Sequence, residues 1–145
     1  MLRAFLGAAA LVMTCAAADA EEYKLGDLII HAPSAFETAK TAKAAGGYMR
    51  IENTGSSNET LVSVQADFPR VELHTTEEKD GVARMMHVGQ IDIPAGEEIV
   101  LQPGGLHVMF MGITDSPFVA GSSVPATLVF ENAGSIDISF DVVSR

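Results

Sequence analysis

The chain has 145 residues, which is the length of a single domain, and its 19 Asp and Glu residues against 9 Lys and Arg give a formal net charge of −10 at pH 7. A surface this acidic repels phosphate backbones and anionic lipids, which excludes nucleic acid and the membrane surface as expected partners. Cations and basic proteins remain the expected classes of partner.

Residues 1–20, MLRAFLGAAALVMTCAAADA, have the composition of a secretory signal peptide. Arg3 precedes an apolar run that is too short for a permanent membrane anchor, and Ala18-Asp19-Ala20 forms an A-x-A cleavage site. We therefore expect cleavage after Ala20, which leaves residues 21–145 as one exported domain without a membrane insertion. Loss of Arg3 and Asp19 keeps the net charge at −10.

Cys15 is the only cysteine of the chain and lies within this leader. The competing interpretation is a lipoprotein acylated at Cys15, although Thr14 stands where such signals usually have Gly, Ala or Ser. With the leader removed, no disulfide, thiolate metal ligand or cysteine nucleophile is expected in the mature domain. Export without a thiol is typical of a bacterial periplasm, which is the expected location.

Short apolar and β-branched runs follow the leader at intervals of about ten residues, separated by turn sequences such as NTGSSN, KDG, PAGE, PGG and NAG. Residues 34–47, SAFETAKTAKAAGG, are compatible with a helix or a loop. The pattern predicts an all-β fold, a single-domain, Ig-like antiparallel β-sandwich of seven to nine strands. The expected strands are YKLGDLIIHA (23–32), GYMRIEN (47–53), TLVSVQAD (60–67), RVELHTT (70–76), VARMMHVGQI (82–91), EEIVLQ (97–102), LHVMFMGI (106–113), ATLVFEN (126–132) and SIDISFDVV (135–143).

The segment RVELHTTEEKDGVARMMHVGQI predicts a β-hairpin. If Asp80-Gly81 is a two-residue turn, Thr76 lies opposite Met85 and His74 lies opposite His87. These four side chains then share one face, with Met85 diagonal to His74 and close enough to share a metal ion.

The strand at 106–112 carries a second group of soft ligands. Side chains alternate between the two faces of a strand, so His107, Met109 and Met111 point one way and the apolar residues between them point into the core. If this face approaches the face of His74 and Met85, two imidazoles and two thioethers converge. Imidazole and thioether suit Cu(I), whereas a blue-copper electron-transfer centre would need Cys.

The spacing of these residues resembles the copper-binding motif of the periplasmic copper chaperones called PCu(A)C. Ten residues separate His74 from Met85, and twenty-one residues separate Met85 from the pair His107-x-Met109. Further segments resemble the same family in the same order: GGYMRIENTG, VELH, PAGEEIVLQPGGLHVMFMGI and VPATLVFENAGSIDISFDV.

This resemblance implies a cupredoxin-like β-sandwich that holds one Cu(I) per monomer, with His74, Met85, His107 and Met109 as ligands. It also implies that the protein passes copper to the copper-site subunit of cytochrome c oxidase or to the Sco-type carrier that precedes it. Lower pH is expected to weaken binding, because the imidazoles become protonated.

Two further residues are candidates of lower rank. His87 shares the predicted face and could replace or support Met85, or serve as a solvated or supporting histidine. Met111 continues the face of His107 and Met109, but its position favours the core or the rim of the site. We expect Met86 to lie in the core, and His31 to be structural or on the surface.

The sequence shows no catalytic motif of the G-x-S-x-G or H-E-x-x-H type, so we expect a protein that is not an enzyme. Two alternatives to a copper carrier remain open. One is a secreted Ig-like binding module without a metal, although the chain has no Trp and only two Tyr for such a surface. The other is a carrier of a different metal such as zinc, which prefers carboxylate or Cys to Met.

Overall fold

The computed structural model describes residues 21–145, which form eleven strands and no helix. No helix within this range is long and apolar enough to cross a bilayer. The expected signal peptide lies outside the described residues, so its cleavage stays a prediction. The strands are β1 (Glu22–Leu25), β2 (Leu28–Phe36), β3 (Ala44–Asn53), β4 (Glu59–Gln65), β5 (Arg70–Lys79), β6 (Val82–Val88), β7 (Ile91–Ile93), β8 (Glu98–Leu101), β9 (Leu106–Met111), β10 (Ser123–Phe130) and β11 (Gly134–Val143).

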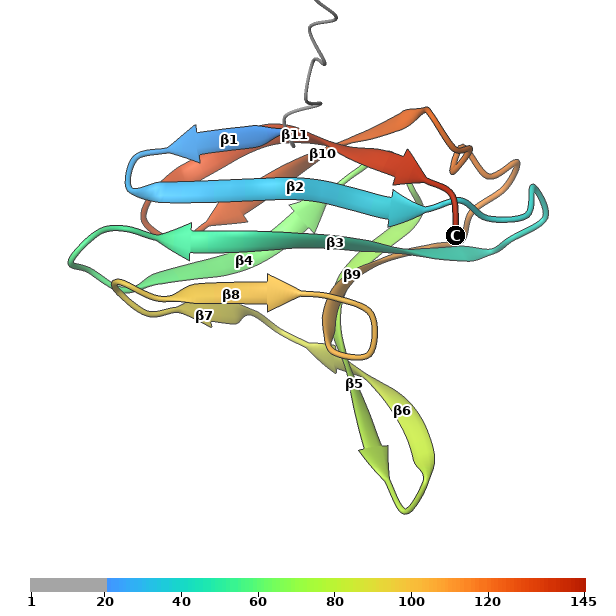
Figure 1. Cartoon of the computed structure of the whole chain (residues 1–145), viewed down its shortest axis with the longest axis horizontal. Coiled ribbons are helices and arrows are strands. Elements are labelled where there is room, and N and C mark those ends of the chain that lie inside the picture. The colour runs from blue at the N-terminus through green and yellow to red at the C-terminus, as the bar shows by residue number, and fades with distance from the viewer. Residues whose placement is uncertain (1–20) are drawn as a thin grey trace, which may run out of the picture.

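The strands form one continuous sheet that folds back on itself, with the order β6-β5-β9-β3-β2-β11-β10-β4-β7. β1 pairs with β2, and β8 pairs with β3. Figure 1 shows β4 and β10 lying behind β2 and β3, so that two layers enclose the core. The predicted all-β sandwich is confirmed, with one parallel pair, β2 with β11, among otherwise antiparallel neighbours.

The strand number exceeds the predicted range because two expected strands are interrupted at glycines. Gly26 adopts φ +56° in the turn that separates β1 from β2. Gly89 stands between β6 and β7, where the chain leaves one sheet edge for the other. Residues 34–47, which the sequence left open between helix and loop, are the end of β2, a loop and the start of β3.

The core lies between the two layers and fixes which face of β9 points outward. Val108 and Phe110 are fully buried, and the Phe110 ring lies 5.3 Å from Phe118 and 5.5 Å from Phe140. Because alternate side chains take opposite faces, this packing leaves His107 and Met109 on the outer face of the sheet. Burial of the aromatic rings thus orients the face of β9 that carries the predicted ligands, without any contribution from a metal.

The β5–β6 hairpin projects from the body of the sandwich (Figure 1). Its turn residues Asp80 and Gly81 have φ values of +55° and +75°, as a two-residue type I′ turn requires. Lys79 therefore pairs with Val82, and the predicted register is confirmed along the whole hairpin. β6 is a terminal strand of the sheet and pairs only with β5.

Candidate metal centre

Three neighbouring strands bring the predicted ligands to one face of the sheet. His74 on β5 lies opposite His107 on β9 and opposite His87 on β6. The His74 ring centroid is 5.9 Å from that of His107 and 6.1 Å from that of His87. The predicted approach of the two ligand faces therefore takes place side by side within one sheet.

The methionines flank this row of imidazoles on the same face. Met85 pairs with Thr76, which is two residues from His74 toward the hairpin tip. Met109 pairs with Glu72, which is two residues from His74 in the other direction. Met85 is 58 % exposed, whereas Met109 is partly buried. The site thus has one sheltered and one exposed thioether.

Each of the two central imidazoles has one ring nitrogen held by a hydrogen bond and one without a partner. Nδ1 of His107 lies 2.9 Å from the carbonyl oxygen of Gly105, and because a carbonyl only accepts, Nδ1 carries the proton. Nε2 of His74 lies 2.8 Å from Oε2 of Glu72, which selects the opposite tautomer. Nδ1 of His74 and Nε2 of His107 are buried and make no hydrogen bond, which is uncommon for buried polar atoms.

Glu72 is ionised at neutral pH and holds His74 in place. The hydrogen bond from His74 keeps the pKa of Glu72 below its usual value, despite an opposing effect of desolvation. Arg70 adds a further lowering through its charge and places Nε 3.0 Å from Oε1 of Glu72. Sequence reasoning missed this residue, although the E-x-H spacing on a strand puts Glu72 and His74 on one face.

A cavity of about 530 Å³ opens beside the row of imidazoles. Met85, His107 and Met109 line it together with Tyr48, whose ring centroid lies 6.5 Å from that of His107. A Cβ atom on Gly46, which pairs with Met109, would lie 2.5 Å from the Tyr48 hydroxyl oxygen. Glycine at this position therefore makes room for the tyrosine that lines the cavity.

The two candidates of lower rank lie at the margins of the site. His87 is exposed and lines a separate small hollow with Glu72. The sulfur of Met111 lies 3.3 Å from Nη2 of Arg70, and Met111 does not line the cavity of Met85 and Met109. The prediction that Met86 is a core residue is wrong: it is 44 % exposed, because β6 has no second layer behind it.

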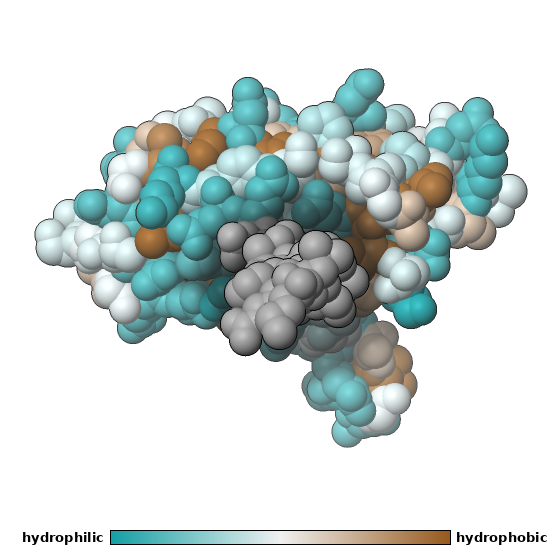
Figure 2. All heavy atoms as spheres, turned by 45° about the horizontal axis from the view of Figure 1, so that its top comes forward, coloured by the Kyte–Doolittle hydropathy of each residue, from teal (hydrophilic) through white to brown (hydrophobic). Residues whose placement is uncertain are grey.

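The exposed methionines give the hairpin an apolar surface. Figure 2 shows hydrophobic side chains on the projecting hairpin, where Val82, Met85 and Met86 are the exposed large apolar residues. Successive residues of β6 alternate between its two faces, so Met85 lies on the face of the cavity, whereas Val82 and Met86 lie on the opposite face.

The chemistry of this donor set fits a soft, monovalent metal ion. Two neutral imidazoles with free ring nitrogens and two thioethers are uncharged ligands, and thioether sulfur favours Cu(I) over the harder divalent ions. The hydrogen bonds to Glu72 and to the Gly105 carbonyl provide the outer support that metal-binding histidines usually have.

The fold is similar to that of solved PCuAC domains over most of the length of the chain. The chain itself belongs to the LpqE-like family: the family model described as putative lipoprotein LpqE-like matches residues 25–142. A putative lipoprotein of Leifsonia xyli subsp. xyli (strain CTCB07) is 33 % identical over 107 residues, which are 69 % of this chain. The match spans 64 % of the length of that relative.

Two copper-bound structures are among the similar folds. The copper-bound PCuAC domain from PmoF2 is 27 % identical, with a TM-score of 0.73, and the match covers 86 % of this chain and 99 % of that domain. The solution structure of CuI-DR1885 from Deinococcus radiodurans is 26 % identical, with a TM-score of 0.61, over 77 % of this chain and 74 % of that one. Both belong to proteins whose structures were solved with copper bound.

Proposed function

We propose that the protein is an exported copper carrier that holds one Cu(I) and is not an enzyme. The observation that carries this proposal is the pair of buried, unpartnered nitrogens, Nδ1 of His74 and Nε2 of His107, beside Met85 and Met109. The similarity to copper-bound PCuAC domains supports copper as the metal. His74, Met85, His107 and Met109 are the proposed ligands.

The copper is cargo, and release depends on the neutral donor set. Two imidazoles and two thioethers around Cu(I) leave a net charge of +1 on the centre, with no anionic ligand to separate from the metal. Met85 is 58 % exposed on a projecting hairpin, so a partner can approach the ion from this side. We expect a cysteine or histidine of the recipient to bind first and displace Met85, with copper remaining Cu(I) throughout.

The recipient that we propose is the copper-site subunit of cytochrome c oxidase or a Sco-type carrier, because the motif spacing resembles that of chaperones serving this pathway. Such partners would be met in the periplasm after export. Mixing the Cu(I)-loaded protein with either copper-free recipient under anaerobic conditions should move the metal within the mixing time. Retention of copper by the carrier in the presence of both recipients would contradict this part of the proposal.

The direct test is an anaerobic titration of residues 21–145, which contain every described strand and core residue, with Cu(I) against a chromophoric chelator. We expect one equivalent to be retained, and His107→Ala and Met109→Ala to weaken binding roughly tenfold or more, as loss of ligand-shell contacts does. Met111→Ala is the matched control, because its thioether contacts Arg70.

Three results would contradict the proposal. The wild-type protein could fail to compete with a weak chelator, the His107 and Met109 variants could retain copper as well as the wild type, or zinc could displace the bound copper. The first two would favour a binding module without this metal, and the third would favour a zinc carrier.

A further inference from the structure

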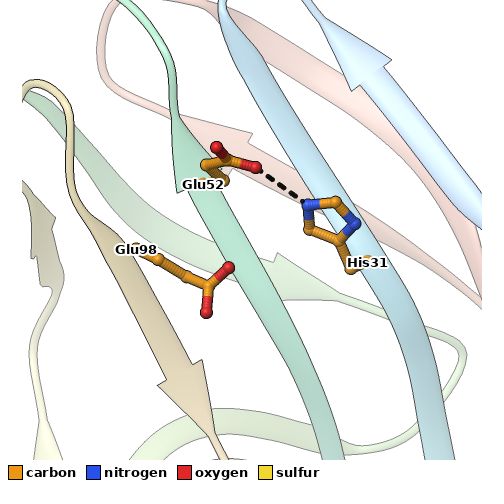
Figure 3. A group of neighbouring side chains, drawn as sticks. All are labelled: His31, Glu52 and Glu98. Atoms are coloured by element: carbon orange, nitrogen blue, oxygen red, sulfur yellow. Dashed lines mark hydrogen bonds and ion pairs between the residues drawn. The ribbon is translucent and has the colours of Figure 1, made fainter.

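A second group of ligating side chains lies on β2, β3 and β8, away from the histidine and methionine face. His31, Glu52 and Glu98 each offer one ligand atom, and these three atoms lie within 4.8 Å of one another. Figure 3 shows the three side chains gathered over β3. Glu52 is six residues along β3 from Gly46, which borders the copper cavity, a span of about 20 Å along the strand.

The register of the strands places like charges against each other here. Glu52 pairs directly with Glu98, and two carboxylates in this position repel each other. Glu98 has a cationic partner, because its Oε2 lies 3.1 Å from Nη1 of Arg50. Among residues 21–145, the only ion-pair partner of Glu52 is His31, whose Nε2 lies 3.1 Å from Oε2 of Glu52.

His31 has a carboxylate at each ring nitrogen. Its Nδ1 lies 3.3 Å from Oε2 of Glu22, on the neighbouring strand β1, while its Nε2 faces Glu52. A neutral imidazole carries one N–H and donates to only one of these carboxylates. At the other nitrogen, a lone pair then faces a negative oxygen, and a cation placed between them removes this repulsion.

We propose that Nε2 of His31, Glu52 and Glu98 bind one divalent cation of the zinc class. In the structure His31 makes its hydrogen bond through Nε2 to Glu52. In the proposed arrangement the ring proton is on Nδ1, 3.3 Å from Glu22, and Nε2 binds the metal, which is the carboxylate–histidine–metal pattern common in zinc sites. His74 has a similar arrangement, because Glu72 binds its Nε2 and leaves its Nδ1 without a partner.

The donor set selects the class of ion. One imidazole and two carboxylates are typical zinc ligands, whereas Mg²⁺ and Ca²⁺ prefer oxygen alone. Cu(I) prefers thioether sulfur, which this group lacks. The two carboxylates are partly exposed, at 42 % and 34 %, so Glu98 is free to turn from Arg50 toward an ion. The site is therefore independent of the proposed copper carrier function and takes a different metal.

The test is a calorimetric titration of residues 21–145 with Zn²⁺ at neutral pH, in a His74→Ala/His107→Ala background that removes the central imidazoles of the copper site. We expect one equivalent to bind, and Glu52→Gln to weaken its affinity roughly tenfold or more. Zinc should also raise the melting temperature of the parent, and raise that of the Glu52→Gln variant by less at the same zinc concentration, because stabilisation by a ligand falls as its dissociation constant rises.

Glu77→Gln removes a carboxylate from the exposed hairpin and is the matched control, which should bind zinc like its parent. The inference is overturned if no zinc binds, or if Glu52→Gln and Glu77→Gln have the same effect. It is also overturned if nuclear magnetic resonance finds His31 protonated on both nitrogens at neutral pH and unaffected by zinc. In that case a proton, and not a metal ion, lies between Nε2 of His31 and the Glu52 carboxylate. Circular dichroism of each variant verifies folding.

Discussion

The two central histidines have different ring nitrogens available for a metal ion: Nδ1 in His74 and Nε2 in His107. His107 is fixed through Nδ1 by a backbone carbonyl, and His74 is fixed through Nε2 by the Glu72 carboxylate. The first anchor comes with the backbone, whereas the second depends on one partly buried side chain and its pairing with Arg70. Glu72 is therefore the residue through which the orientation of His74 is most easily changed.

Replacement of Glu72 by Gln should weaken Cu(I) binding about 10- to 100-fold, as loss of a supporting partner of a metal-binding histidine typically does. The amide can present its NH₂ group to His74, which removes the fixed preference for one tautomer. Chelator competition measures the change, and Glu77→Gln on the other face of β5 serves as control. An unchanged Cu(I) affinity in the Glu72 variant would show that His74 needs no such support.

At the scale of elements, the hairpin and the strand β9 differ in how far the sequence determines them. The Asp80-Gly81 turn is a local signal, so the pairing of His74 with His87 and of Thr76 with Met85 followed from counting residues. That β9 lies directly beside β5 is a contact between distant parts of the chain, which no local pattern encodes. The spacing of the ligands in the sequence indicated that they converge, but it did not reveal that β5 and β9 are paired strands.

The same distinction explains the other misses. Met86 was expected in the core because an apolar residue in a strand usually faces a second layer, but β6 projects beyond the sandwich and has none. The cluster around His31 joins four strands, and Glu98 reaches it only through the pairing of β8 with the distant strand β3, which no local pattern encodes. Sequence reasoning therefore reached the fold class, the local hairpin and the convergence of the two ligand faces, but it did not reveal which strands are neighbours in the sheet.

The β10–β11 turn is held to β4 by Glu59. Burial by itself would raise the pKa of this carboxyl, but hydrogen bonds from the backbone N–H groups of Thr60, Asn132 and Ala133 outweigh burial and keep the pKa below its usual value. A lowered pKa in the folded state contributes stability that is complete above the unfolded pKa of about 4.3 and is lost as the pH falls through the folded value.

We expect Glu59→Gln to lower the free energy of unfolding at neutral pH by about 1–3 kcal/mol, because the amide NH₂ faces a backbone donor and leaves it without an acceptor. The loss should shrink as the pH falls below the unfolded pKa and through the lower folded pKa of Glu59, where the wild-type carboxyl becomes protonated. Urea denaturation of both proteins across this range measures the effect. A difference that stays constant with pH would contradict the role assigned to the ionised carboxylate.

At the scale of the whole molecule, the β5–β6 hairpin, which carries two of the proposed copper ligands, projects from the sandwich (Figure 1). The core packing that fixes β9 does not depend on copper, so copper loading should leave the sandwich in place. The net charge of −10 favours cations and basic surfaces and slows encounters with acidic ones. These properties suit a carrier that meets its cargo and its partners outside the cytoplasm.

Export predicts a defined N-terminus. We expect the intact mass of the protein recovered from the periplasm of a Gram-negative host to correspond to a chain that begins at Glu21, because Ala18-Asp19-Ala20 is the cleavage site indicated by the sequence. The family is described as putative lipoproteins, so the alternative is a lipoprotein that is acylated at Cys15. A membrane-bound, acylated protein beginning at Cys15 would overturn the predicted cleavage and convert the domain into a tethered carrier.

The most direct test of the account is the X-ray absorption spectrum of the Cu(I)-loaded protein at the copper edge. Two imidazole nitrogens and two thioethers as ligands should appear as both nitrogen and sulfur scatterers in the first shell, and Met109→Ala should reduce the sulfur contribution. A first shell of nitrogen and oxygen alone, or a sulfur contribution unaffected by Met109→Ala and Met85→Ala, would contradict the claim that this face of the sheet holds the copper.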